Sequence, residues 1–287
     1  DTIDVDLADG LALDASGNTS LRAAIMQANA LPDSDLILLP AGNYRLTEQF
    51  DDSSSYDVRD DAFGDLDVDL GQVVIEGAGS GSTVIDATAV VDRVMEVGPE
   101  ASLRLSGVQL TGGNAGLQQG GGALLNTGNA TLDGVWIDDN QASVGGGIQS
   151  LSGDLSIANS TISDNFAHQA GGGIAVGGFR TGSSGTVVIQ NSTISANAAE
   201  TLGGGIYYQT SFPPQVVNLT YVTLVENQAG TGAGIAGPPM AQGGEGGGSS
   251  SPFTVHASIV SNNLAQGEAD VVGDFTSLGS NLIGAAN

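Results

Sequence analysis

The stretch that decides the fold is LSIANSTISDNFAHQAGGGI, residues 155–174. A closely related stretch, VVIQNSTISANAAETLGGGI, follows at residues 187–206. Each contains two apolar residues separated by one residue, then a Thr-Ile-Ser segment, an Asn, three glycines and an Ile. A period of two in apolar residues is typical of short β-strands, and the intervening turn residues leave no segment long enough for a helix.

The same unit recurs along the chain from residue 103 to residue 235, followed by a partial copy. Its recurring positions are Leu103, Leu105, Leu110, Asn114 and Gly120–Gly122; Leu132, Ile137, Asn140 and Gly145–Gly147; Leu155, Ile157, Ile162, Asn165 and Gly171–Gly173; Val187, Ile189, Ile194, Asn197 and Gly203–Gly205; Val217, Leu219, Leu224, Asn227 and Gly232–Gly234; and Val255, Ile259 and Asn262 or Asn263. One unit cannot bury its own apolar side chains, so each has to stack on its neighbours.

The sequence therefore predicts an all-β fold, a right-handed, single-stranded parallel β-helix with three short strands per coil. Each strand is expected to pair with its counterpart one coil along, about 4.8 Å away. The recurring asparagines, from Asn140 to Asn227, are expected to stack at one corner of the tube, because Asn tolerates left-handed backbone and bonds to a stacked copy of itself. The glycine triplets are expected to form a second, sharply bent corner.

The N-terminal region predicts the only helix, at about residues 19–30. Thr19 or Ser20 can cap it, and Leu21, Ile25 and Ala28 share one face. This face is expected to cover the open end of the tube, which would otherwise expose the core and an unpaired strand edge. We interpret residues 1–287 as a single domain, with a capping region at 1–46, an acidic loop at 47–70 and stacked coils at 71–287.

The composition restricts the partners of the protein. Its 287 residues include 32 acidic residues against six arginines, no lysine and no cysteine, with a net charge of −26. This charge opposes binding to nucleic acid and to anionic lipid. No apolar run approaches the length of a membrane span. An export signal or an anchor would lie outside these residues, and the oligomeric state stays open.

Several motifs resemble those of a known family. They are NTSLRAAI (18–25), LPAGNYRL (39–46), GDLD (64–67), VIEGAG (74–79), SIV (258–260) and SLGSNLIG (277–284). The first four motifs resemble the CSLREA-type N-terminal module, and the last two resemble the end of a choice-of-anchor Q domain. The repeated glycine and Asn units between them resemble polymorphic outer-membrane protein (Pmp-like) repeats. Thr19 stands where the module has Cys, and Ala23 where it has Glu. The resemblance implies an exported bacterial β-helix held at the cell surface by a variable anchor.

The densest acidic stretch suggests a cation site. Asp61, Asp65, Asp67 and Asp69 are hard oxygen ligands from one segment, which suits Ca²⁺. The last three would point to one face if the segment were extended. The alternative is a solvated acidic loop without a ligand, since neither EF-hand spacing nor a Gly-Gly-x-Gly-x-Asp repeat is present.

A catalytic site has to be considered, because parallel β-helices include polysaccharide lyases and glycosidases. Asp138 and Asp139, beside Trp136, form the best carboxylate pair, and His168 and Arg180 could join them from later coils. The alternative is a solvated Asp pair at a turn. The Arg-x-Lys and Gly-His-Gly signatures of polygalacturonase-like enzymes are absent.

Three insertions occupy the same place in the repeat, at 174–187, 206–216 and 235–255. Stacking is expected to align them on one edge of the tube, where repeat proteins commonly carry a binding face. The candidate ligand-binding residues on this edge are Phe179, Arg180, Tyr207, Tyr208 and Phe212. The alternative is a set of tolerated surface insertions.

These observations predict an extracellular or cell-surface, adhesin-like β-helix that presents stacked loops to glycans or to surface proteins. The alternative is a polysaccharide-active enzyme, a lyase or a glycoside hydrolase, with an acidic site on the β-helix. Ice or mineral binding would require a regular array of threonines, and the Thr positions are too scattered in the sequence to predict one.

Overall fold

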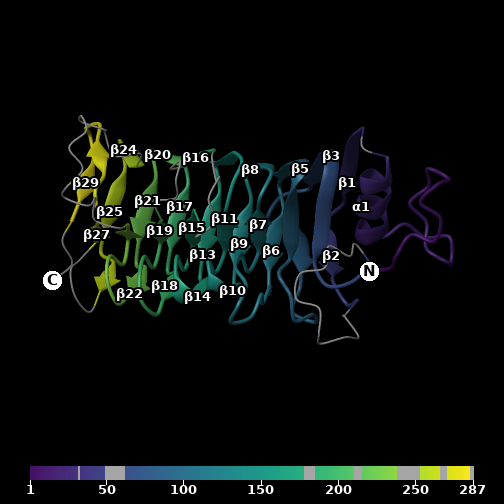
Figure 1. Cartoon of the computed structure of the whole chain (residues 1–287), viewed down its shortest axis with the longest axis horizontal. Coiled ribbons are helices and arrows are strands. Elements are labelled where there is room, and N and C mark those ends of the chain that lie inside the picture. The colour runs from purple at the N-terminus through teal and green to yellow at the C-terminus, as the bar shows by residue number, and fades with distance from the viewer. Residues whose placement is uncertain are drawn as a thin grey trace.

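The computed structural model describes residues 1–31, 33–48, 62–177, 185–209, 215–237, 253–265 and 270–284. Within these ranges the chain forms one helix, α1, and three sheets whose strands are all parallel. The strands wind into a tube, and α1 lies at its N-terminal end (Figure 1). This arrangement confirms the predicted parallel β-helix with an N-terminal helix.

The three sheets run parallel to the tube axis, and among the described residues the smallest of them begins only at residue 141. A central coil carries four short strands, two of them in the large sheet, so the predicted number of three strands per coil is wrong. The large sheet contains β1 (Ser34–Leu39), β3 (Leu66–Gly77), β5 (Met95–Ser106), β7 (Leu124–Asn126), β8 (Asn129–Asp133), β11 (Ile148–Ser150), β12 (Leu155–Ala158), β15 (Ile174–Val176), β16 (Thr186–Gln190), β19 (Ile206–Tyr208), β20 (Val216–Thr220), β23 (Ile235–Ala236), β24 (Phe253–His256), β27 (Val271–Val272) and β28 (Thr276–Ser277). The nine-stranded sheet contains β2 (Gly42–Arg45), β4 (Thr83–Asp86), β6 (Gln109–Thr111), β9 (Trp136–Asp138), β13 (Thr161–Ser163), β17 (Thr193–Ser195), β21 (Thr223–Val225), β25 (Ile259–Ser261) and β29 (Leu282–Ile283). The five-stranded sheet contains β10 (Gln141–Val144), β14 (Phe166–Ala170), β18 (Ala198–Ala199), β22 (Gln228–Ala229) and β26 (Leu264–Ala265).

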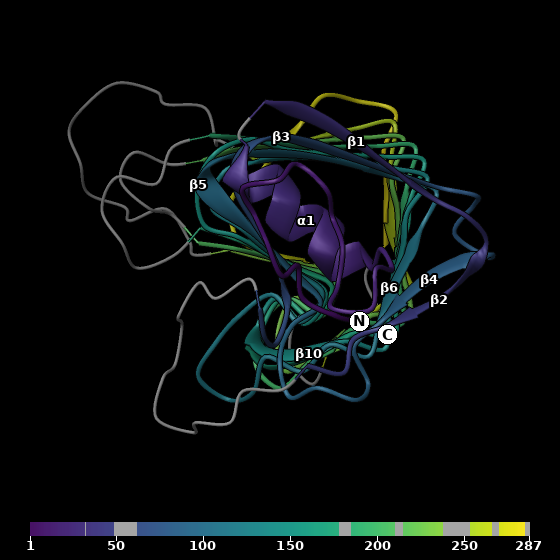
Figure 2. The same ribbon diagram turned by 90° about the vertical axis from the view of Figure 1, so that its right-hand side faces the viewer.

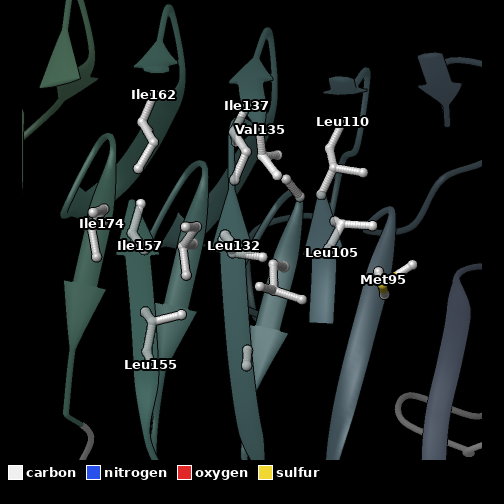
Figure 3. Packing of buried hydrophobic residues seen from close by; sticks show 14 of the residues in the cluster. Met95, Leu105, Leu110, Leu132, Val135, Ile137, Leu155, Ile157, Ile162 and Ile174 are labelled. Atoms are coloured by element: carbon white, nitrogen blue, oxygen red, sulfur yellow. The ribbon is translucent and has the colours of Figure 1, made fainter. Parts of the chain in front are cut away.

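The apolar residues of each unit point into the tube, as their period of two predicts. In β12, Leu155 and Ile157 are at most 1% exposed, whereas Ser156 between them is half-buried on the outer side. Leu155 pairs in register with Val187 of the next coil, so like residues stack along the axis. Figure 3 shows the resulting column of Leu, Ile and Val side chains. Burial of these columns is the main source of stability in such a fold.

The predicted asparagine corner is confirmed. Asn140, Asn165, Asn197 and Asn227 lie one behind the other, and each donates both its backbone N–H and its Nδ2 to the Oδ1 of the next. Asn263 continues this ladder, accepting both bonds from Asn227 at 2.9–3.0 Å.

The first unit is shifted by one residue from its predicted alignment. Leu110 pairs with Ile137, which places Gly113, not Asn114, at the ladder position. Gly113 donates its N–H to Asn140 Oδ1 at 2.8 Å. A Cβ at this position would lie 1.9 Å from the carbonyl oxygen of Gly122, so only glycine fits there.

The glycine triplets form the second corner as predicted. Gly145 and Gly171, which open two successive triplets, have φ of 66° and 70°. At Gly146, a Cβ would lie 2.4 Å from the carbonyl oxygen of Phe166 in the next coil. Glycine is therefore required at this corner both for backbone conformation and for the close approach of stacked coils.

Helix α1 (Leu21–Ala30) lies across the N-terminal end of the tube, as Figure 2 shows. Ser20 is its N-cap, and its Oγ accepts a hydrogen bond from the N–H of Ala23 at 3.1 Å. The predicted face of the helix, Leu21, Ile25 and Ala28, joins the core and is at most 7% exposed. The helix thereby shields the first coil from water.

Two polar side chains of α1 fasten it to the tube. The guanidinium of Arg22, 1% exposed, donates to the carbonyl oxygens of Gly64 and Asp65 at 2.7 and 2.8 Å. Asn29 donates to the carbonyl oxygen of Asp67 at 2.7 Å and accepts from the N–H of Asp69 at 2.9 Å. Four backbone groups between residues 64 and 69 thus find hydrogen-bond partners on the helix.

The predicted acidic loop at residues 47–70 is too long at its C-terminal end. Strand β3 begins at Leu66, and Leu66 and Val68 are at most 1% exposed because they pair with the apolar positions of β5. Residues 49–61 lie outside the described part of the chain.

Candidate functional site

The outer face of the nine-stranded sheet carries two straight columns of side chains. In the first column, Trp136, Thr161, Thr193, Thr223 and Ile259 follow one another in register. In the second column, Asp138, Ser163, Ser195, Val225 and Ser261 do the same. The residue between the two columns on each strand is an apolar core residue, so both columns point away from the core.

These columns correct the expectation that the threonines are scattered. Thr161, Thr193 and Thr223 are 32 and 30 residues apart in the sequence, yet parallel pairing places them on adjacent strands. Coils of unequal length conceal this regularity. The column is nevertheless bounded by Trp136 and by Ile259, so the hydroxyl array is short and mixed with apolar surface.

Trp136 is the largest side chain on this face and is 36% exposed. Its indole N–H donates to Ser163 Oγ at 3.0 Å, and since Trp136 pairs with Thr161, the ring reaches diagonally across the sheet. The indole borders an open pocket of about 430 Å³. Other residues that line this pocket are Asn159, Thr161, Ser163, Asp164 and Ser195. The pocket thus combines one aromatic ring with hydroxyl, amide and carboxylate groups.

Asp138 stands beside the pocket on the same strand as Trp136. It is 6% exposed, and Gln109 Nε2 donates to its Oδ1 at 2.8 Å. Burial raises the pKa of Asp138 to about 6, with further increase from the charges of Asp139 and Asp164, against the opposing hydrogen bond from Gln109. This carboxyl group is therefore the member of the predicted catalytic pair that can change its protonation near neutral pH.

The other predicted catalytic residues lie elsewhere. Asp139 is exposed at the turn after β9, with φ of 54°. His168 lies on β14 in the five-stranded sheet, across the asparagine corner from Asp138, where its ring approaches Glu200 at 3.2 Å. Arg180 lies outside the described residues. The described residues therefore do not bring His168 together with the Asp pair.

A second group of interest is a buried acidic cluster near the N-terminal end. Asp65, Asp67 and Glu96 each place a carboxylate oxygen within 4.8 Å of the others. Asp67 pairs in register with Glu96, and all three residues are at most 4% exposed. The structure thus supplies Glu96, 29 residues after Asp67, in the place where the sequence suggested Asp69. Asp61 lies outside the described residues.

Arg93 already provides a positive charge to this cluster. Its Nη1 lies 2.8 Å from Glu96 Oε2 and 3.3 Å from Asp65 Oδ2. Burial raises the pKa of Asp65 to about 7 even though Arg93 attracts the ionised form. Arg22 lies close as well, since its guanidinium donates to the carbonyl oxygen of Asp65 at 2.8 Å. The cluster therefore already has cationic side chains beside it. Calcium binding stays a prediction.

The strands that flank the three insertions are stacked in register, as the repeat predicts, and most of the inserted residues themselves lie outside the described part of the chain. Val176 pairs with Tyr208 before the insertions, and Val217 pairs with Phe253 after two of them. Tyr207 is half-buried on the outer side of β19. Phe179, Arg180 and Phe212 lie outside the described residues.

Tyr208 corrects the prediction for this edge, because it belongs to the core and not to the surface. It is 4% exposed, and its ring packs edge-on against Phe253 with 5.9 Å between centroids. Its hydroxyl group donates to the carbonyl oxygen of Gln215 at 3.3 Å. The alternation along β19 places Ile206 and Tyr208 inward and Tyr207 outward, so a period of two from Ile206 would have found this.

Comparison with known proteins supports the fold. The model of the family described as "Right handed beta helix region" matches residues 78–237, which is more than half of the chain. The chain belongs to this family. No curated protein and no solved structure matches it. Among the described residues of this right-handed β-helix, no helix is long and apolar enough to cross a membrane.

Proposed function

We propose that this β-helix is a non-enzymatic, extracellular or cell-surface protein of adhesin type, and that it binds glycans at the pocket beside Trp136. The observation that carries the proposal is the exposed indole set among Thr161, Ser163 and Asn159. Aromatic rings stack on the C–H faces of sugars, and hydroxyl and amide groups bond to sugar hydroxyls. The rigid ladder beneath the pocket holds these groups in place.

The proposal includes the resemblance to exported bacterial surface proteins. The motifs of the CSLREA module, of the Pmp-like repeats and of the choice-of-anchor Q end support export and attachment to a bacterial surface. Protein partners on that surface remain an alternative ligand for the edge that carries Tyr207.

The test is a glycan array probed with the labelled protein and two variants. Trp136→Ala is expected to remove the signals of the bound glycans while the thermal stability stays close to that of the wild type. Tyr207→Ala is the matched aromatic control on another face and is expected to keep them. Loss of binding only in Tyr207→Ala would move the site to the insertion edge, and unchanged binding in both variants would refute both locations.

The enzyme alternative is favoured by one observation, the pKa of Asp138 raised to about 6. A general acid works best with a pKa near the working pH. Release of reducing ends, or of unsaturated products, from polysaccharides by the wild type but not by Asp138→Asn would establish this activity. We expect neither release, because Asp138 is buried and its predicted partner His168 lies on another sheet.

A further inference from the structure

The turns that flank the nine-stranded sheet are unusually constant. Two residues connect each of β8, β12, β16, β20 and β24 to the following strand of the nine-stranded sheet, and two more connect that strand to the five-stranded sheet. The insertions of this region fall instead between β15 and β16, β19 and β20, and β23 and β24. The outer face of β9, β13, β17, β21 and β25 is therefore a straight wall, and no connection of variable length starts beside it (Figure 1).

This wall repeats its chemistry along the tube axis. Successive strands are about 4.8 Å apart, so the five strands from β9 to β25 span about 19 Å. Along that distance, the first column presents the indole of Trp136 and then the hydroxyl and methyl groups of Thr161, Thr193 and Thr223. A ligand that matches this wall has to be long, with a repeat near one residue per coil, and has to offer both hydroxyl groups and apolar C–H surface.

Charge decides the class of such a ligand. Asp139, Asp164 and Glu226 are exposed at three of the four equivalent turns between β9 and β22 along one rim of the wall, each with a left-handed φ between 54° and 60°. Ala196 holds the remaining turn. Neither column contains an Arg between β9 and β25, and the chain has no lysine. Uronates, sulfated sugars and phosphate polymers would meet like charge there.

We propose that this wall binds a neutral, extended polysaccharide that lies along the tube axis. One pyranose ring stacks on Trp136, and the following rings lie over Thr161, Thr193 and Thr223 at about one ring per coil. This inference rests on the proposed function and deepens it, since the pocket beside Trp136 becomes one end of a longer site.

The test is isothermal titration calorimetry with neutral β-1,4-linked glucan and mannan oligosaccharides of increasing length, and with oligogalacturonates of the same lengths. Affinity is expected to rise with each added ring as far as the wall extends, and the oligogalacturonates are expected not to bind. Trp136→Ala is expected to weaken all binding by about thirtyfold. Thr193→Val, which removes one hydroxyl group at constant shape, is expected to weaken only the longer oligosaccharides, by about fivefold.

Thr131→Val is the matched control, because Thr131 is also a half-buried strand threonine but lies on the large sheet. It is expected to bind like the wild type. Binding that depends on Trp136 but not on length or on Thr193 would refute the extended site and leave the proposed function intact. Preference for oligogalacturonates would refute the neutral ligand. Absence of binding to the whole series and to the glycan array would refute the proposed function together with this inference.

Discussion

Replacement of Asn165 by Ala tests the asparagine ladder at its centre. The Asn165 side chain, 1% exposed, makes five hydrogen bonds: its Oδ1 accepts from the N–H and the Nδ2 of Asn140, and its Nδ2 donates to Ile137 O, Ser163 O and Asn197 Oδ1. In Asn165→Ala, the backbone N–H of Asn140 loses this partner inside the tube. An unsatisfied buried donor costs about 1–3 kcal/mol, so with the lost carbonyl bonds we expect a decrease in the free energy of unfolding of about 3 kcal/mol.

Asn159→Gly is the control, because Asn159 also forms a side-chain ladder in the same coil but is exposed. Its Nδ2 donates to Asp133 Oδ1 and its Oδ1 accepts from Asn191 Nδ2, both at 2.7 Å. Its φ is 52°, and Gly134 holds the same position one coil earlier with φ of 63°, so glycine introduces no strain. We expect a cost below about 1 kcal/mol.

The assay is equilibrium urea unfolding followed by circular dichroism, together with amide hydrogen exchange of the segment around Asn140. Local exchange is needed because long repeat arrays do not always unfold in one step. In Asn165→Ala, the amide of Asn140 is expected to exchange faster than in the control. Equal midpoints for the two variants, with unchanged exchange, would refute a stabilising role for the buried ladder.

Four further predictions concern stability. Leu21→Asp is expected to destabilise the chain by several kcal/mol, because it buries an unpaired charge under the helix, and thermal melting measures it. Tyr208→Ala is expected to cost about 3–5 kcal/mol as a core truncation, against about 1 kcal/mol for Tyr207→Ala; equal urea midpoints for the two would contradict the inward orientation. The raised pKa of Asp138 means that this carboxyl group stays protonated in the folded chain up to about pH 6, so the free energy of unfolding is expected to fall as pH rises from about 4 to about 6. Asp138→Asn is expected to flatten that part of the plot of stability against pH. Ca²⁺ is expected to raise the melting temperature of the wild type relative to EDTA, and Asp65→Asn is expected to reduce this rise. Identical melting temperatures in Ca²⁺ and EDTA would show that the buried acidic cluster does not bind Ca²⁺.

Much of the scaffold could be predicted because its signals are local. Asn165 follows the inward-pointing Ile162 by three residues, and the ladder asparagines of the neighbouring units follow their inward Ile or Leu by the same three residues. A short strand and a two-residue turn have nearly the same geometry in each coil, so equal spacing in the sequence gives equivalent positions in the structure. The predicted alignment of the first unit is wrong by one residue, because Gly113 occupies the ladder position and an Asn, Asn114, follows directly after it. A periodic pattern does not distinguish these two positions, whereas the pairing of Leu110 with Ile137 does.

The candidate site was only partly predictable. Trp136 and Asp138 were singled out, but as a catalytic neighbourhood, and the hydroxyl columns beside them were missed. The Thr-Ile-Ser segments at 161–163 and 193–195 were a sufficient signal, since equivalent strands of a solenoid must stack. Glu96 offered no such signal, because only the pairing of β3 with β5 places it beside Asp67.

The sequence by itself determined that this chain folds as a parallel β-helix closed by a helix at its N-terminal end, since period-two strands, recurring Asn and glycine corners act over a few residues. The tertiary structure alone decided which side chains of different coils meet on the surface and in the buried cluster. The physical reason is that coils of unequal length separate spatial neighbours by varying distances in the sequence, and only the hydrogen-bonded register between strands restores them to a common spacing.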